Sequence, residues 1–453
     1  MKKQAIDSEG SMDRISELPQ PLLHDILCFL SQKEAVQTSV LSKSWRYLGS
    51  TRPNLHFHQR LFDGDEPTLR YVLDKTLQRY HDQKLQIKEF CLTMSGFDHT
   101  ESISFLKKWV PIVILNVGLQ SFSLKFLCKY HNEFFKLPHV FFESETLQRL
   151  SLHGCKLTQT PVNSVILCKH LQRLFLDRVY IADKTLNMIF SSCGLIETLV
   201  LHRCRGLRTI KFDDRIRLKL FDFENNDMVR RHDDPIIEIN SPTLETVKIL
   251  SFPSWFNHHK YLVPHLKSLY LESMQLPSRA FDSFSSNFPS LEELSLIYCH
   301  GFEELQLSSR SLKNFIISWC GGNPLKAVID APSLVVFEYR GQNIPQSISF
   351  QATASEWESE IVVSCDMTVD DSVASVWCLE LYEILKALSK SKISLCIIQN
   401  FVANVEDIKE EEETYGGLCE PVVVERLVLS SESRPNPSSV FLKNLKRICL
   451  ARN

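Results

Sequence analysis

The sequence predicts an α/β protein in which a short all-helical segment is followed by a long solenoid of parallel strands. Two observations predict this fold class. Apolar residues between Ile15 and about Tyr47 recur with the period of an α-helix. From about Leu85 onward the chain repeats short units of the form apolar-x-x-apolar-x-apolar, and each unit is too short to close a core of its own.

Length and composition limit the class of protein. With 453 residues the chain exceeds the size at which a single core keeps growing, so several domains or a repeat array are expected. The 51 basic and 54 acidic residues give a net charge of −3, which offers no electrostatic footprint for nucleic acid or an anionic membrane. The N-terminus lacks the apolar core of a signal peptide, and no stretch approaches about 18 uninterrupted apolar residues. We therefore expect a soluble, non-secreted protein of the cytoplasm or nucleus, with its fourteen cysteines reduced.

The helical segment follows a polar stretch, residues 1–11, that we expect to be a disordered tail. One apolar stripe is typical of an amphipathic helix and consists of Leu22, Leu23, Ile26, Leu27 and Leu30. Pro19 stands where a first helical turn tolerates proline. Further short helices are predicted over 34–40 and 42–48. Because fewer than about 50 residues of helix make only a small core, this segment is expected to lean on a partner.

The repeat units are regular enough to set a register. Their first apolar residues are Ile87, Leu119, Leu147, Leu171, Ile196, Leu218, Leu244, Leu266, Leu291, Leu312 and Leu334. From Leu147 onward the spacing between units is 21 to 26 residues, within the roughly 20 to 29 residues of a leucine-rich repeat. Each unit would supply one strand whose fourth and sixth positions point inward. Stacked units then give a curved solenoid over 85–345, a horseshoe with a parallel sheet on its concave face.

Cysteines support the same register. Cys155, Cys204, Cys299 and Cys320 each lie eight positions after the first apolar residue of their unit. This is the Asn/Cys position of the leucine-rich repeat, where a small side chain sits beneath the turn. The four cysteines are therefore explained by the repeat rather than by a disulfide or a metal.

The repeat pattern fades beyond residue 345. We expect the C-terminal region, 346–453, to hold degenerate or capping repeats. An amphipathic helix is predicted over 373–388. Two leucine-rich fragments return at 424–429 and 445–450, and we interpret both as late or capping repeats.

A family resemblance is carried by the segment Asp13–Leu30, which reads DRISELPQPLLHDILCFL, and by its continuation Ala35–Arg46, which reads AVQTSVLSKSWR. Together they closely resemble an F-box, particularly those of plant F-box/leucine-rich-repeat proteins. The likeness extends through the repeats and covers about residues 12 to 345. We expect the F-box to occupy 12–60 and a linker to occupy 61–84. The sequence departs from the plant pattern at Gln20, where an acid is usual, and at Gly49, where a tryptophan is frequent.

The resemblance implies a function. F-box residues of this family divide between a small core and the groove of a Skp-type adaptor, which in turn binds a cullin. Residues at the matching positions are Leu18, Pro19, Leu22, Leu23, Ile26, Leu27, Leu30, Val36, Val40, Leu41 and Trp45. The chain would then be the substrate-recognition subunit of an SCF-type (Skp-cullin-F-box) ubiquitin ligase. It would carry no catalytic residues and no cofactor of its own, and its repeats would hold a protein client.

Outward-facing third and fifth positions of the units are the candidates for client binding. They include Arg149, Arg173, Phe175, Val200, Lys248, Tyr270, Glu293 and Ile316. Exposed aromatic and aliphatic side chains suit a protein-binding surface because such side chains dominate interface energetics.

Other functions are open on the sequence. The repeats could sequester a partner outside any ubiquitin ligase, or they could hold a small molecule that fixes the client in place. We predict no metal site, because Cys193, His202 and Cys204 lack a paired C-x-x-C and the His258-His259 pair stands alone. A catalytic thiol is not indicated by any spacing, and a glycine-rich phosphate loop is absent from the sequence.

Overall fold

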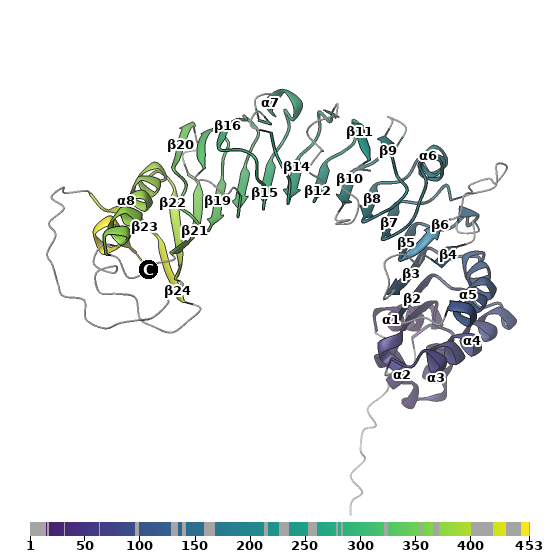
Figure 1. Cartoon of the computed structure of the whole chain (residues 1–453). Helices are drawn as coiled ribbons and strands as arrows, with labels where there is room; N and C mark the ends of the chain where they lie inside the picture. Colours follow the sequence, from purple (N-terminus) through teal and green to yellow (C-terminus); the bar gives the residue numbers. More distant parts are fainter. Residues whose placement is uncertain are drawn as a thin grey trace, which may run out of the picture. The chain divides into compact units, whose positions relative to one another are not determined.

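A computed structural model of the chain describes most of its length. The described residues are 15, 18–30, 32–62, 64–95, 99–127, 135–137, 142–157, 168–212, 216–225, 235–251, 261–277, 280–281, 284–320, 325–352, 356–365, 371–399, 420–431 and 445–452. The tail expected over 1–11 lies outside them, as do His258 and His259. The chain divides into an N-terminal unit, Met1–Thr198 with Cys204–Gly206, and a C-terminal unit, Leu199–Arg203 with Leu207–Asn453. Each unit is described separately (Figure 1).

The N-terminal unit begins with the predicted helices. These are α1 (Gln20–Phe29), α2 (Gln32–Gln37), the 3-10 helix η1 (Thr38–Val40) and α3 (Lys43–Ser50). Pro19 precedes α1, as the sequence predicts, and Ser42 caps α3 by accepting a hydrogen bond from the backbone N–H of Trp45 at 3.2 Å. Leu23, Leu27, Ala35, Trp45 and Leu48 form the core of this small module.

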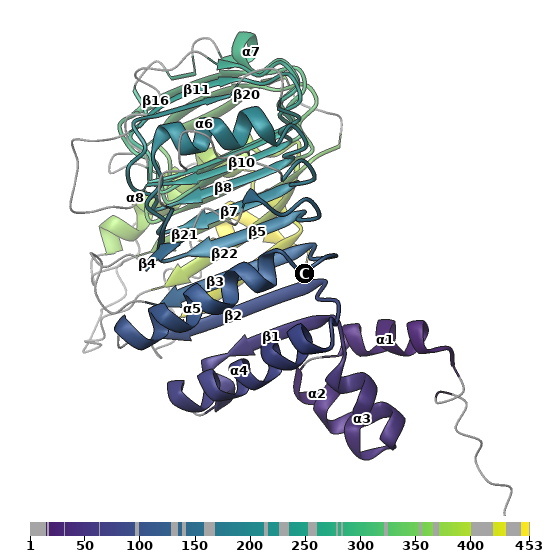
Figure 2. The same ribbon diagram turned by 90° about the vertical axis from the view of Figure 1, so that its right-hand side faces the viewer.

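Parallel strands follow in the same unit. Its elements are β1 (Asn54–His58), η2 (Gln59–Phe62), α4 (Glu66–Asp82), β2 (Glu89–Ser95), α5 (His99–Ile114), β3 (Ser121–Leu127), β4 (Phe135–Leu137), β5 (Arg149–His153), β6 (Cys155–Leu157), β7 (Arg173–Asp177) and α6 (Asp183–Ser192). The main sheet of the unit runs in the order β1-β2-β3-β5-β7. Helices α4 and α5 lie side by side on one face of it (Figure 2).

The segment 61–84 is not the linker that we predicted. Most of it is α4, which buries Leu69, Leu73 and Leu77, and β1 pairs in parallel with β2. The repeats therefore begin at about residue 52 rather than 85. The first unit escaped the pattern because a buried Arg52 stands two residues before its strand, where the other units have leucine or isoleucine.

The C-terminal unit continues the array. Its elements are β8 (Thr198–His202), β9 (Thr209–Phe212), β10 (Leu220–Glu224), β11 (Ile236–Asn240), β12 (Thr246–Leu250), β13 (Tyr261–Leu262), β14 (Ser268–Glu272), α7 (Phe284–Asn287), β15 (Glu293–Ile297), β16 (Glu304–Ser308), β17 (Asn314–Ser318), β18 (Lys326–Asp330), β19 (Val336–Gly341), β20 (Ser347–Ala352), β21 (Glu358–Cys365), α8 (Asp371–Ala387), β22 (Lys392–Gln399), β23 (Val422–Val424), β24 (Arg426–Ser431) and β25 (Cys449–Ala451). Here the main sheet runs in the order β8-β10-β12-β14-β15-β17-β19-β21-β22-β24.

Within this unit the main sheet lies along the inner side of a curve, and smaller sheets, β13-β11-β9 and β16-β18-β20, lie on the outer side (Figure 1). The parallel sheet expected on a concave face is therefore present here. The fourth and sixth positions of the units point inward, as predicted. Leu269, Leu271, Leu294 and Leu296, for example, are fully buried.

The solenoid does not end at residue 345. Strands β21, β22 and β24 extend the main sheet, and α8 confirms the helix predicted over 373–388. The fragment at 424–429 forms β24 as expected. The fragment at 445–450 instead supplies β25, which pairs with β23 outside the main sheet. The pattern missed β21 and β22 because Glu356 and Lys390 stand where their units should begin with an apolar residue.

Two repeated contacts hold successive units together. A Ser or Thr before a unit's first apolar residue donates to a carbonyl of the preceding unit: Thr146 to Leu119 at 2.8 Å, Thr243 to Leu218 at 2.9 Å and Ser311 to Leu291 at 2.8 Å. Cysteines at the predicted position do the same from beneath the turn. Cys204 donates to Leu176 at 3.4 Å, Cys299 to Leu271 at 3.5 Å and Cys320 to Leu296 at 3.3 Å.

Candidate functional site

The helical module buries only part of its apolar surface. Of the predicted F-box residues, Leu23, Leu27 and Trp45 lie in its core, and Leu18, Ile26 and Leu30 pack partly against that core. These six side chains stabilise the module. The three buried ones, Leu23, Leu27 and Trp45, are therefore poorly suited as contacts for a partner.

Other predicted F-box residues lie on the surface. Pro19 and Leu22 are exposed, and so are Val40 and Leu41; Val40 is 81% exposed. The side chain of Val36 lies outside the described residues. The described F-box residues thus fall into a buried or partly buried group and an exposed group.

Three further apolar side chains of the module are exposed, and the sequence reasoning missed them. They are Ile15, Phe29 and Tyr47, and Phe29 is 89% exposed. A signal for Phe29 was present, since α1 carries two stripes at spacings of four and three. One stripe, Leu23-Leu27-Leu30, faces the core, and the other contains Leu22 and Phe29. A helix that is apolar on both sides requires burial on both sides.

The exposed apolar residues come from α1, η1, α3 and their flanks, all within 33 residues of sequence. Large exposed apolar side chains so concentrated are typical of protein-binding surfaces. Burying one Leu, Val or Phe contributes roughly 1.5 to 3 kcal/mol by transfer estimates, so three or four of them could support a stable complex even after association costs.

The client-binding candidates fall into both units and differ in burial. Arg149, Arg173 and Phe175 belong to the N-terminal unit, where Arg149 pairs in register with Arg173. The remaining candidates lie on the main sheet of the C-terminal unit. Arg149, Arg173 and Glu293 are exposed, while Phe175, Lys248, Tyr270 and Ile316 are half-buried.

Val200 does not fit the prediction. Its side chain is only 9% exposed, so it offers little surface to a client. We expected Val200 to be exposed because alternate residues of a strand point outward. Alternation gives the direction of a side chain but does not reveal whether neighbouring side chains cover it.

Acidic residues on the C-terminal sheet were the main feature that sequence reasoning missed. His202 lies 2.8 Å from Asp222 and 3.6 Å from Glu224, measured between nitrogen and carboxylate oxygen. The Tyr270 hydroxyl donates to Glu272 at 2.5 Å. Burial, and then the hydrogen bond to Glu272, raise the pKa of the Tyr270 phenol, so it stays a neutral donor.

The part of the chain that the structure describes offers no metal site, and burial suppresses the reactivity of one of its thiols. No group of three or more His, Cys, Asp or Glu side chains there could hold a metal ion. Burial raises the pKa of the Cys193 thiol to about 12, which opposes nucleophilic chemistry at neutral pH. Among the described helices, none has the length and hydrophobicity needed to cross a membrane.

The fold defines a class of protein: a small helical module followed by a leucine-rich-repeat solenoid. Sequence comparison agrees. An F-box domain matches residues 15–57, the LRR domain of the At1g61320/AtMIF1 type matches 79–258, and the LRR repeats of FBD-associated F-box protein At5g56370 match 216–351.

Curated relatives come from Arabidopsis thaliana. F-box/LRR-repeat protein 25 is 31% identical over 49% of this chain and 79% of its own length. F-box/LRR-repeat protein At3g59200 is 32% identical over 42% of this chain and 37% of its own length. F-box/FBD/LRR-repeat protein At5g56420 is 28% identical over 52% of this chain and 55% of its own length. The chain thus spans about half, or less, of the length of two of these three relatives.

The chain belongs to the F-box/LRR-repeat family. F-box domains generally bind Skp-type adaptors within SCF complexes, and F-box/LRR proteins are generally non-catalytic adaptors.

Proposed function

We propose that this chain is the substrate-recognition subunit of an SCF-type ubiquitin ligase in the cytoplasm or nucleus. The F-box binds a Skp-type adaptor, and through it a cullin, while the outward face of the repeats holds a protein client. The observation that carries the proposal is the set of exposed apolar residues on the helical module, Pro19, Leu22, Phe29, Val40, Leu41 and Tyr47.

Chemistry in this proposal is supplied by other subunits. The chain raises the effective concentration of one client beside a ubiquitin-charged enzyme that the cullin brings.

A matched pair of substitutions tests adaptor binding. Val40 and Val117 are about equally exposed, at 81% and 80%, but Val40 belongs to the F-box and Val117 to the loop before β3. Val40→Asp should weaken the affinity for a purified Skp-type adaptor at least about tenfold, because it places a charge in an apolar interface. Val117→Asp should leave the affinity unchanged.

Affinity is measured by isothermal titration calorimetry and folding by thermal unfolding of each variant. Because both valines are on the surface, neither variant should unfold at a lower temperature. If the wild type and Val40→Asp bind the adaptor with equal affinity, the exposed apolar residues around Val40 are not the adaptor-binding surface. A folded chain that binds no Skp-type adaptor at all would favour a sequestering role instead.

A further inference from the structure

The outward face of the main sheet between β10 and β21 is strongly acidic. Its outward positions carry seven carboxylates, Asp222, Glu224, Glu272, Glu293, Glu338, Glu358 and Glu360, and two cations, Lys248 and Arg340. Without these nine residues the chain has 49 basic and 47 acidic side chains. These nine residues therefore sum to a charge of −5, whereas the rest of the chain sums to +2.

Strand pairing brings carboxylates together on this face. Glu338 of β19 is directly opposite Glu360 of β21, and Arg340 contacts both, lying 3.2 Å from the Glu360 carboxylate. One cation thus serves two anions. Glu293 and Glu358, on β15 and β21, are exposed. Like charges on neighbouring strands are unfavourable in the free protein, and a cationic partner would relieve that repulsion.

Two exposed aromatic side chains border the acidic face. Tyr298 follows β15 and Trp319 follows β17, which are adjacent strands, and their side chains are 54% and 37% exposed. Their backbone N–H groups continue the strand ladder by donating to the carbonyls of Ser318 and Arg340 at 2.8 and 2.6 Å. This fixes the backbone at both positions. Aromatic faces attract Lys and Arg side chains and also pack on their aliphatic stems.

Apolar side chains lie between the carboxylates. Ile297 and Ile316 are half-buried on the adjacent strands β15 and β17, and Ile297 directly precedes Tyr298. The face therefore combines negative charge with aromatic and aliphatic contact area. This combination complements a segment that alternates cationic and apolar side chains, whereas an acidic segment would be repelled.

We propose that the outward face of β10–β21, with Tyr298 and Trp319 at its border, binds a Lys- and Arg-rich segment of the client protein. This assignment rests on the proposed function in one respect, that the repeats hold a client. It adds the chemical class of that client. The aromatic pair receives a cationic side chain, and Glu272, Glu293, Glu338 and Glu360 pair with its neighbours.

Fluorescence anisotropy with the full-length chain tests the proposal. The probe is a labelled twelve-residue peptide of alternating Arg and Leu, and its comparison is the same peptide with Glu in place of Arg. The Arg peptide should bind at least about tenfold more tightly, and more weakly as salt increases. Trp319→Ala and the double variant Glu293→Gln/Glu360→Gln should each lower that affinity about fivefold or more.

Matched controls come from elsewhere in the same unit. Glu304 is exposed on β16 of the smaller sheet β16-β18-β20, and Val335 is exposed just before β19. Glu304→Gln and Val335→Ala should leave peptide affinity unchanged. Equal binding of the two peptides, or equal losses in the control and test variants, would overturn the proposal.

Adaptor binding separates this proposal from the proposed function. All of these variants should bind the Skp-type adaptor as the wild type does, because none alters the helical module. If the wild-type chain binds the Arg peptide selectively but does not bind the adaptor, the ligase role is refuted and the site for a basic segment stands. If the wild-type chain binds the adaptor but binds both peptides equally, the site for a basic segment is refuted and the ligase role stands.

Discussion

At the residue scale, one recurring backbone conformation shapes the array. The residue directly after a main strand has positive φ in seven units: Gly154, Arg178, Arg203, Ser251, Ser273, Tyr298 and Trp319. Left-handed backbone costs a non-glycine residue about 1 to 2 kcal/mol. The stacked units impose it nonetheless, because the N–H of this residue donates to the next strand, as Ser251 does to Glu272 at 2.8 Å.

Gly154 should be the least replaceable of these residues. Its φ is +72°, and a Cβ there would lie 2.3 Å from the backbone oxygen of Phe126. Gly154→Ala should therefore lower the free energy of unfolding by about 2 kcal/mol or more. Ser251→Gly, which relieves strain at the equivalent position, should change it by less than about 1 kcal/mol. Urea unfolding measures both, and equal effects would contradict this explanation.

Because of two buried thiols, the free energy of unfolding should decrease as the pH rises above 9. Burial raises the pKa of Cys168 and of Cys193 from 9.0 to about 12. Below pH 9 both states keep these protons, so the contribution of the thiols is fully present. Between pH 9 and about 12 only the unfolded chain releases them, so stability should fall by about 1 kcal/mol per thiol per pH unit.

The double variant Cys168→Ala/Cys193→Ala provides the comparison. Its unfolding free energy should decline less steeply between pH 9 and 10.5 than that of the wild type. Chemical denaturation across this range measures both slopes. Identical slopes would mean that the two thiols titrate alike in the folded and unfolded states.

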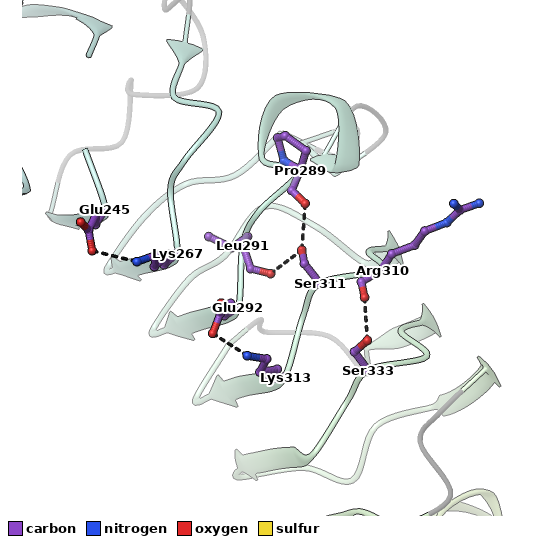
Figure 3. A network of polar contacts seen from close by, with 9 residues as sticks. All are labelled: Glu245, Lys267, Pro289, Leu291, Glu292, Arg310, Ser311, Lys313 and Ser333. Carbon is purple, nitrogen blue, oxygen red and sulfur yellow. Dashed lines mark hydrogen bonds and ion pairs between the residues drawn. The ribbon is translucent and has the colours of Figure 1, made fainter. Parts of the chain in front are cut away.

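At the element scale, neighbouring units are joined by two kinds of polar contact along one edge of the sheet (Figure 3). Ser311 lies within hydrogen-bonding distance of the carbonyls of Leu291 and Pro289, at 2.8 and 3.0 Å. Lys313 pairs with Glu292 at 2.8 Å in solvent. The Lys313 hydrogen bond lowers the pKa of the Glu292 carboxyl, but solvent screens such an exposed pair.

The hydroxyl should matter more than the ion pair. Ser311→Ala should lower the free energy of unfolding by about 1 kcal/mol, because the hydroxyl that bonds to the preceding unit is lost. Lys313→Met should leave the unfolding midpoint unchanged. Thermal unfolding at low and high salt checks both variants, and a larger loss in Lys313→Met would reverse this ranking.

Units with a leucine or isoleucine at the first position were predictable from sequence, together with their inward side chains and the cysteines beneath their turns. Units with Arg52, Glu356 or Lys390 at that position were not. There the strand is specified by the neighbours it pairs with, which a single-sequence pattern cannot detect. Helix α4 was taken for a linker because the unit before it, with Arg52 at its first position, was not recognised. Val200 was taken for an exposed residue because strand alternation does not reveal which neighbouring side chains cover it.

At the scale of the whole molecule, sequence resemblance identified the F-box, and burial then separated its core from its surface. Trp45 and Phe29 illustrate the difference, because both are aromatic but only Trp45 is buried in the free chain. Sequence could not anticipate the acidic face, since its carboxylates are scattered over about 140 residues and meet only through strand pairing.

Hydrogen exchange of the full chain, with and without a purified Skp-type adaptor, tests the central claim most directly. We expect the adaptor to slow amide exchange in α1 and in the segment from η1 to α3, and to leave β14, β15 and β17 unchanged. Protection confined to the repeats, or no protection anywhere in a well-folded chain, would contradict the assignment of the helical module as the adaptor-docking surface.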